Sequence, residues 1–179
     1  MKKNKIAVSL LLVCFTVLFS AVSYAQTKEE KIVEDAADAK AAFIKTDATM
    51  EDLFSRSYGY VIFPNVGKGA FIIGGAGANG VVYENAEQIG TAKLRQVSVG
   101  FQAGGQTYRE VIFFEDEAAM ERFKENKIEF SGQVSAVAAK SNASANAKYT
   151  DGVQVYTQGK NGLMFEAAVG GQKFYYKEL

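Results

Sequence analysis

The feature that most constrains this chain is the change of residue pattern at Tyr58. Residues 27–57 are rich in Ala and Glu, whereas the residues after them form Gly-punctuated runs of β-branched and aromatic side chains. Such side chains favour strands, and the glycines mark turns between strands. The pattern therefore predicts an α+β protein in which helices come first and a β-sheet follows.

Ten runs of the later part are predicted strands. They are Gly59–Phe63, Ala70–Gly74, Gly80–Glu84, Ala92–Gln102, Tyr108–Phe114, Ile128–Ala138, Ser144–Tyr149, Val153–Thr157, Gly162–Val169 and Gln172–Tyr176. Along residues 96–102, Val and Phe alternate with Gln and Ser, which predicts a sheet with one covered face. Many short strands joined by Gly-rich turns favour an antiparallel, strongly curved or barrel-like sheet.

Two amphipathic helices are predicted before the strands. Thr27 and Glu30 fit a capping box, and apolar residues at helical spacing follow them to about residue 45. Asp47 can cap a second, shorter helix whose apolar stripe ends at Phe54. Such stripes usually pack on the protein's own core, and insertion into a membrane is the alternative.

One further short helix is predicted among the strands. It opens at the acidic run 115–117, which suits the positive end of a helix, and it closes at Asn126. Calcium binding by this run is the weaker alternative, because consecutive residues at a helix start do not point at one ion. No metal site is predicted.

The first residues have the pattern of an export signal. Three lysines precede an apolar run of sixteen residues, 6–21, and small residues stand at Ser23 and Ala25. We therefore expect cleavage after Ala25, a single domain over residues 26–179 (26–57 helical, 58–179 mainly β) and a periplasmic or secreted location. A retained membrane anchor is the alternative, because the run is only slightly shorter than the ~20 residues of a typical span.

The composition after this signal excludes several kinds of chemistry. Residues 26–179 contain no His, Cys or Trp, so zinc sites, imidazole-based triads and thiol nucleophiles are not expected. Removal of residues 1–25 takes away three of 20 basic residues and none of the 20 acidic ones, so the mature charge is near minus three. Carboxylate-only hydrolysis is compatible with the composition. We nevertheless expect a binding domain without a cofactor rather than an enzyme.

Gly75, Gly77 and Gly80 form a G-x-G-x-x-G pattern after a predicted strand. In a dinucleotide site, a helix begins at these glycines and an acidic residue follows about twenty positions later. Here the run Val81–Tyr83 predicts another strand, and residues 96–100 contain no acid. The glycines are therefore predicted to form a strand bend with close backbone approach, and no nucleotide or nucleic acid is expected as a partner.

Several spaced motifs resemble a known family. The run from Tyr58 to Gly75 has an apolar strand that ends in Phe63-Pro64, a lysine four residues later, an aromatic strand and the paired Gly74-Gly75. With Gly77, Gly80 and Val81, it looks like the opening of the SYLF lipid-binding domain, also called the Ysc84 actin-binding domain. The later runs 111–123, 128–138, 142–147 and 162–166 are similar to the family in the same order, so the resemblance covers about residues 47–176. One departure is Lys68-Gly69-Ala70-Phe71, where the family usually has Lys-Ala-Gly-Phe.

The resemblance implies a non-enzymatic lipid-binding or membrane-surface domain. Eukaryotic members are described as binding phosphoinositides, and some actin, from the cytosolic side, whereas an exported protein would meet neither there. Lys68 is the headgroup contact implied by the family motif. Phe63, Pro64, Gly74, Gly75, Gly77 and Gly80 are its structural motif.

Further lipid contacts are predicted from charge and amphipathicity. Lys45, Lys93 and Arg95 are candidates on charge alone, with a solvated surface position as the ordinary role of such residues. Phe43 and Ile44 can insert into a membrane, which would supply roughly 3 to 6 kcal/mol against about 1 for one lysine. Membrane binding is therefore expected to depend more on these two apolar residues than on charge.

A second hypothesis is an envelope scaffold or protein-interaction module. It would bind through an exposed sheet edge or through aromatic residues near the C-terminus, such as Tyr175 and Tyr176. Binding to liposomes distinguishes the two hypotheses, because a scaffold has no need of a lipid surface.

Overall fold

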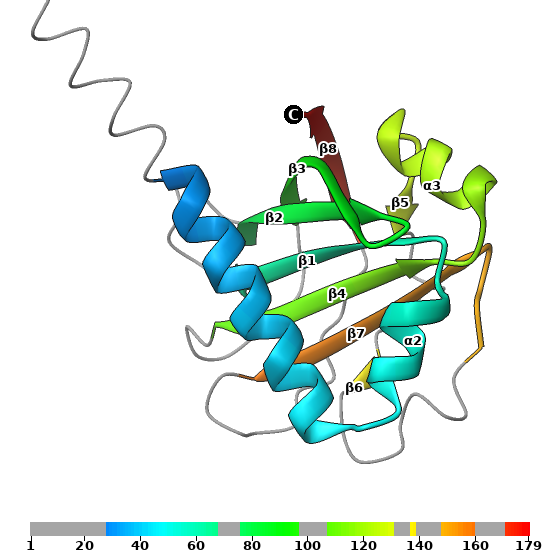
Figure 1. The fold of residues 1–179 in the computed structure, drawn as a ribbon. Coiled ribbons are helices and arrows are strands. Elements are labelled where there is room, and N and C mark those ends of the chain that lie inside the picture. Colours follow the sequence, from blue (N-terminus) through cyan, green and yellow to red (C-terminus); the bar gives the residue numbers. More distant parts are fainter. Residues whose placement is uncertain (1–27, 68–75, 97–106, 131–136, 139–147, 160–170) are drawn as a thin grey trace, which may run out of the picture. The chain divides into compact units, whose positions relative to one another are not determined.

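The computed structural model describes residues 28–67, 76–96, 107–130, 137–138, 148–159 and 171–179 (Figure 1). The chain divides into two compact units, Met1–Glu34 and Asp35–Leu179. In the first unit the described residues are 28–34, the beginning of a helix. The export signal predicted for residues 1–25 lies outside the described residues.

The first helix spans residues 28–46, close to the predicted 27–45. Its part within the second unit buries one stripe completely, namely Ala36, Ala39 and Phe43. Lys40 Nζ donates a hydrogen bond of 3.0 Å to the Tyr60 hydroxyl and lies 4.8 Å from the centre of the Phe54 ring. These contacts tie residues 35–46 to the second helix and to the sheet.

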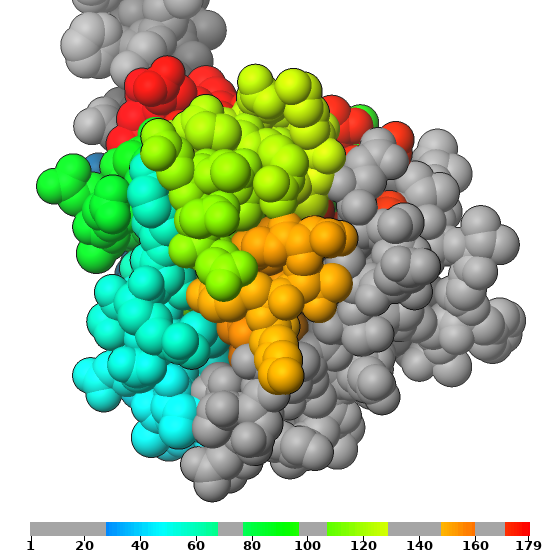
Figure 2. Space-filling view, turned by 90° about the vertical axis from the view of Figure 1, so that its right-hand side faces the viewer, coloured from blue at the N-terminus to red at the C-terminus, as the bar shows by residue number. Residues whose placement is uncertain are grey.

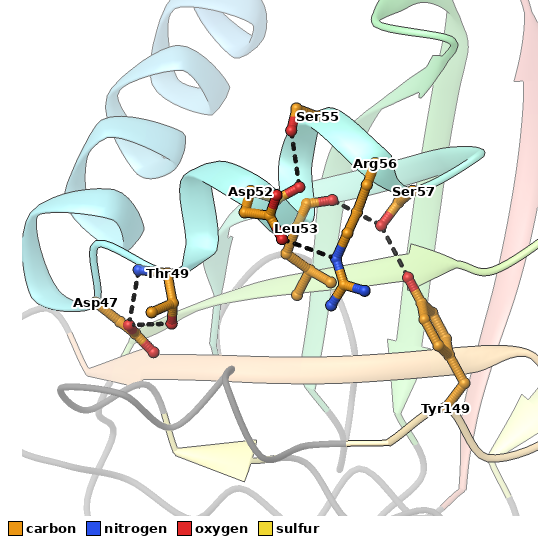
Figure 3. A network of polar contacts seen from close by, with 8 residues as sticks. All are labelled: Asp47, Thr49, Asp52, Leu53, Ser55, Arg56, Ser57 and Tyr149. Carbon is orange, nitrogen blue, oxygen red and sulfur yellow. Dashed lines mark hydrogen bonds and ion pairs between the residues drawn. The ribbon is translucent and has the colours of Figure 1, made fainter.

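The second helix, α2 (Met50–Arg56), begins where the sequence predicts it. Asp47 lies two residues before the N-cap Thr49 and accepts hydrogen bonds from the Thr49 amide (3.0 Å) and hydroxyl (2.5 Å) (Figure 3). Asp47 therefore fixes the turn that leads into α2 rather than capping the helix directly. At the other end, the Ser57 hydroxyl lies 2.9 Å from that of Tyr149.

The described strands form one sheet in the order β5-β8-β3-β2-β1-β4-β7-β6. Six are long: β1 (Gly59–Val66), β2 (Ala76–Glu84), β3 (Glu87–Gln96), β4 (Tyr108–Phe114), β7 (Val153–Gly159) and β8 (Gln172–Glu178). All pairs among these six are antiparallel, as predicted. Each edge carries a two-residue strand, β5 (Glu129–Phe130) beside β8 and β6 (Val137–Ala138) beside β7.

The sheet is open and not strongly curled, so the predicted barrel-like closure is wrong. In the described residues β5 pairs only with β8 and β6 only with β7, so no pairing between the two edge strands closes the sheet. The run Ile128–Ala138 was expected to be one strand, yet its two ends pair at opposite edges. The sequence pattern cannot show this, because strand propensity does not specify a partner.

Both faces of the central strands are buried, which corrects the prediction of one covered face. On the helix-covered face, the centre of the Phe113 ring lies 4.8 Å from that of Phe54 in α2 and 5.9 Å from that of Tyr156. On the opposite face, which we call the core face, the ring centres of Phe114 and of Phe123 in the third helix are 4.9 Å apart. The alternating run that suggested one covered face lies almost wholly outside the described residues.

The third helix, α3 (Glu117–Lys124), follows β4 as predicted, and the Asp116 carboxylate caps it by accepting a 2.8 Å bond from the Ala119 amide. Figure 2 shows α3 (yellow-green) beside the segment that leads into β7 (orange), with α2 (cyan) on the same side. Arg122 donates a 2.6 Å hydrogen bond to the Asp151 carbonyl across this junction. The inserted helix is therefore anchored to β4 and to the start of β7.

Five predicted strands are confirmed with small changes of length, namely those at 59–63, 80–84, 108–114, 153–157 and 172–176. The run 92–102 is confirmed to residue 96. Outside the described residues lie the strands predicted at 70–74 and 162–169 and most of the one at 144–149.

Candidate functional site

The strands β3 and β8 expose one face and bury the other. In β3, Ala92 and Leu94 are buried while Lys93 and Arg95 between them are exposed. In β8, Phe174 is buried and its neighbours are exposed. Because side chains alternate along a strand, the exposed residues of the two paired strands share one surface.

The shared surface carries four cations and one aromatic ring. Register places Lys93 opposite Tyr175, Arg95 opposite Lys173 and Thr91 opposite Lys177. We call the exposed residues Lys93, Arg95, Lys173, Tyr175 and Lys177 the basic face.

Two features of the basic face suit binding better than stability. Arg95 and Lys173 lie directly opposite each other, and like charges in such a cross-strand pair are ordinarily destabilising. Tyr175 is 43% exposed, and Leu179 is the other large hydrophobic side chain that is exposed in the described part of the chain. The Arg95 guanidinium lies 5.4 Å from the centre of the Tyr175 ring, within the range of a cation–π contact.

The acidic residues of these strands lie at their other end. Glu84 and Glu87 flank the turn between β2 and β3, and Glu178 pairs with Gly90 near the same turn. Glu84 is bonded at 2.7 Å to Lys124 of α3, which holds the pKa of the Glu84 carboxyl below its usual value. Charge is therefore partly separated along β3 and β8, although Glu129 of β5 is the cross-strand neighbour of Lys173 at the basic end.

The glycine pattern is structural in the part of it that the structure describes. Gly77 and Gly80 lie in β2, which continues to Glu84, so the prediction that a strand follows is confirmed. A Cβ atom on Gly80 would come within 2.6 Å of the Phe63 ring, because this ring lies across the glycine. Phe63 and Gly80 of the family motif therefore pack on each other.

Pro64 of the same motif is buried in β1, although proline is unusual within a central strand. The register between β1 and β4 shifts between Phe63 and Val66, so Pro64 lies at an irregularity where no ladder hydrogen bond is lost. Lys68, Gly74 and Gly75 of the motif lie outside the described residues.

The lipid contacts predicted on the first helix lie in different environments. Phe43 is fully buried, Ile44 is half-buried and Lys45 is exposed. A lipid contact by Phe43 would therefore require residues 35–46 to leave the sheet. The structure does not bring these residues together with Lys93 and Arg95 in any contact among the described groups.

Sequence reasoning found Lys93 and Arg95 but missed Lys173 and Lys177. The signal was available, because Lys173-Phe174-Tyr175-Tyr176-Lys177 alternates with the same period as β3. What could not be read was the pairing of β8 with β3, since 75 positions separate Gln96 from Gly171. Tyr175 and Tyr176 also separate, because the Tyr176 hydroxyl turns inward and donates a 3.1 Å bond to the Ile89 carbonyl.

Comparison with known proteins agrees with the resemblance seen in the sequence. Residues 95–177, which include most of the basic face, match the family Ysc84, described as "Las17-binding protein actin regulator". Residues 95–177 therefore match a Ysc84 domain. Domains of the Ysc84 family are of the lipid- or actin-binding type and are generally non-catalytic. The opening motif at residues 58–75 lies before the matched Ysc84 range.

The chain is also similar to Beta cell expansion factor A of Aeromonas veronii, with 30% identity over 123 residues. The alignment covers 69% of this chain and 47% of the relative, so the chain spans about half of that protein's length.

The described residues were also compared with the needs of metal binding and membrane crossing. They contain no group of three or more carboxylates that could hold a metal ion. Among the helices in the described ranges, none is both long and apolar enough to span a bilayer.

Proposed function

We propose that this protein is a non-enzymatic domain that binds anionic lipid surfaces through the basic face of β3 and β8. The observation that carries the proposal is the exposed array of four cations around Tyr175. A lysine or arginine near an anionic membrane contributes about 1 kcal/mol, so four of them would contribute up to about 4 kcal/mol. An exposed tyrosine suits the same location, because its ring is amphipathic and favours the headgroup region.

The burial of Phe43 favours the basic face over helix insertion. A side chain that is already out of water gains little hydrophobic free energy by moving into a bilayer. It would also lose its packing against the sheet, which costs about 3 to 5 kcal/mol for a buried phenylalanine. The energetic order expected from the sequence, with apolar insertion ahead of charge, is therefore reversed in this proposal.

Vesicle flotation with a pair of charge reversals tests the proposal. Lys93→Glu with Lys177→Glu should abolish flotation with phosphatidylglycerol-containing vesicles and leave the melting temperature unchanged, because both side chains are exposed. Lys127→Glu with Lys148→Glu makes the same change of net charge at two other exposed lysines and should retain most of the binding. Equal loss in both pairs would show that net charge alone acts and would refute the basic face.

The lipid surface in this proposal is met outside the cytoplasm. Support comes from the lysines, apolar run and small residues of positions 1–25, which have the order of a cleavable signal. N-terminal sequencing of the exported protein should begin at Gln26, and a protein that still begins at Met1 would contradict export by cleavage. If the mature domain does not float with vesicles of any composition, the scaffold or protein-interaction function becomes the better proposal.

A further inference from the structure

A buried carboxyl joins two strands that are not neighbours in the sheet. The Glu110 carboxylate on β4 accepts a 2.9 Å hydrogen bond through Oε2 from Nε2 of Gln172, the first residue of β8, and both residues are fully buried. Three strands, β3, β2 and β1, separate β8 from β4 in the sheet order. The twist of the sheet makes the contact possible, since β8 crosses the direction of β1 and β4 in Figure 1.

The surroundings of this contact are polar but uncharged in the described chain. On the core face, Glu110 has Phe63 of β1 and Thr157 of β7 as its cross-strand neighbours, while Gln172 has Gln96 of β3. Tyr108 of β4 is the titratable group that acts on Glu110, and burial raises the pKa of its hydroxyl, so it is neutral. No described lysine or arginine lies among the groups that act on this carboxyl.

Two oxygen atoms of the pair have no hydrogen-bond partner in the described structure, Oε1 of Glu110 and Oε1 of Gln172. Both are acceptors, so neither can satisfy the other while the carboxyl is ionised. A protonated carboxyl changes this, because a carboxylic acid and a primary amide form a ring of two hydrogen bonds. One bond of that ring is the observed Nε2–Oε2 contact, and the second would join the two oxygens that have no partner.

We propose that Glu110 and Gln172 form a proton-dependent latch that holds the start of β8 on the core face. With the proton in place the acid–amide pair is complete and β8 is fixed. Opening of β8 releases Glu110 to water, where it ionises, so a rise in pH favours the open form.

The electrostatics of the site support this latch. Burial raises the pKa of Glu110 to about 7, against the opposing effect of the hydrogen bonds from Gln172 and Tyr108. A carboxyl in water titrates near 4.5, so opening between pH 4.5 and about 7 releases a proton and becomes easier with each pH unit in that range.

The latch has a consequence for the basic face, and this part rests on the proposed function. Lys173 follows Gln172 directly, and Lys173, Tyr175 and Lys177 all lie on β8. If the start of β8 loosens, these three side chains lose their fixed positions opposite Lys93 and Arg95. Binding to an anionic surface should therefore be stronger in mild acid than at pH 7.5, because protonated Glu110 holds β8 in place.

Two measurements on the free protein test the latch without lipid. Carbon-13 NMR of the side-chain carboxyls should show Glu110 titrating near pH 7, and titration near 4.5 would overturn the proposal. Amide hydrogen exchange of β8, corrected for the intrinsic rate, should accelerate about 40-fold from pH 5 to pH 7 and level off about two-fold higher. In Glu110→Gln, whose amide can complete the same ring without titrating, the corrected exchange should stay constant.

Matched variants separate the latch from general effects of charge. Glu51→Gln removes one exposed carboxylate from α2. The amide hydrogen exchange of β8 in this variant should follow pH as it does in the wild type. Gln172→Met removes both bonds of the ring, so the corrected exchange of β8 at pH 5 should be faster than in the wild type. Wild-type exchange that does not follow the Glu110 titration would overturn the latch even if Glu110→Gln fails to fold.

Vesicle binding distinguishes failure of the latch from failure of the proposed function. Between pH 5.5 and 7.5, flotation of the wild type with phosphatidylglycerol-containing vesicles should weaken several-fold more than flotation of Glu110→Gln. The same loss in both proteins would refute the coupling between the latch and the basic face. No flotation at any pH, together with β8 exchange that follows Glu110, would refute the proposed function and leave the latch standing.

Discussion

The central strands and the strands beside one edge of the sheet are built on different patterns. β1 and β4 are buried along almost their whole length, because helices cover one face and α3 packs on the other. β3 and β8 alternate between buried and exposed residues, and their exposed positions carry the cations. Side chains in the central strands are thus fixed by packing, whereas those of the basic face are exposed to solvent.

The largest effect should come from the covered strands. Phe113→Ala removes a fully buried ring of β4 that contacts the rings of Phe54, Tyr60 and Tyr156. The free energy of unfolding should fall by about 3 to 5 kcal/mol, because a cavity is left in a packed layer. Urea denaturation followed by circular dichroism measures it.

The matched aromatic change on the basic face is Tyr175→Ala, which should cost less than about 1 kcal/mol because the ring is 43% exposed. Similar losses in Tyr175→Ala and Phe113→Ala would mean that β8 is packed on both faces and that the comparison is wrong.

The next largest effect concerns a polar residue inside the covered region. The folded-state pKa of Glu110 is about 7 and its ordinary value is 4.5, so the unfolded chain ionises first as pH rises. The wild type should therefore lose about 3 kcal/mol of stability between pH 4.5 and about 8 through this group, and nothing further at higher pH. Glu110→Gln should lack this loss. The urea midpoints of the two proteins, measured at a series of pH values, give the difference. A constant difference would show that Glu110 is ionised in the fold.

The fold could be predicted where the sequence is locally unambiguous. The run Tyr108–Phe114 has the bounds of β4, and Asp116 caps α3, because strand propensity and capping act within a few residues. Closure of the sheet could not be predicted, since it depends on which edges meet. Continuous apolar runs such as Val111–Phe114 are typical of strands buried on both faces, whereas the alternating run at 96–102 predicts one covered face.

The candidate site could be predicted only in part. Lys93 and Arg95 could be named as candidates on charge alone, and the structure places both at exposed positions of β3. Lys173 and Lys177 join them through long-range pairing, which no local pattern encodes. Glu110 looked like one more polar residue in a strand, and its partner Gln172 lies 62 positions away.

A third test concerns the close contact between β1 and β2. Gly80→Val should destabilise by about 1 to 3 kcal/mol, because its Cβ would meet the Phe63 ring at 2.6 Å and the Ile62 carbonyl at 2.7 Å. Asn79→Val is the matched control, since Asn79 is the exposed neighbour in β2 and valine favours strands. Thermal unfolding should separate the two variants. An equally stable Gly80→Val would show that Phe63 can move aside and that this glycine is not required by packing.

The smallest effect should appear in binding rather than in stability. Lys93→Ala removes one cation of the basic face and should weaken binding to phosphatidylglycerol-containing vesicles by about 1 kcal/mol, roughly five-fold in affinity. Lys45→Ala removes an exposed cation next to half-buried Ile44 on the first helix and should change the affinity much less. Both variants lose one positive charge, so the difference between them reports position and not net charge.

The five-fold loss should also shrink as salt is added, because an exposed lysine acts through a screened interaction. Titration at two salt concentrations therefore checks the mechanism along with the site. If Lys45→Ala weakens binding more than Lys93→Ala, the first helix is the membrane contact, and the exposed strands have another purpose.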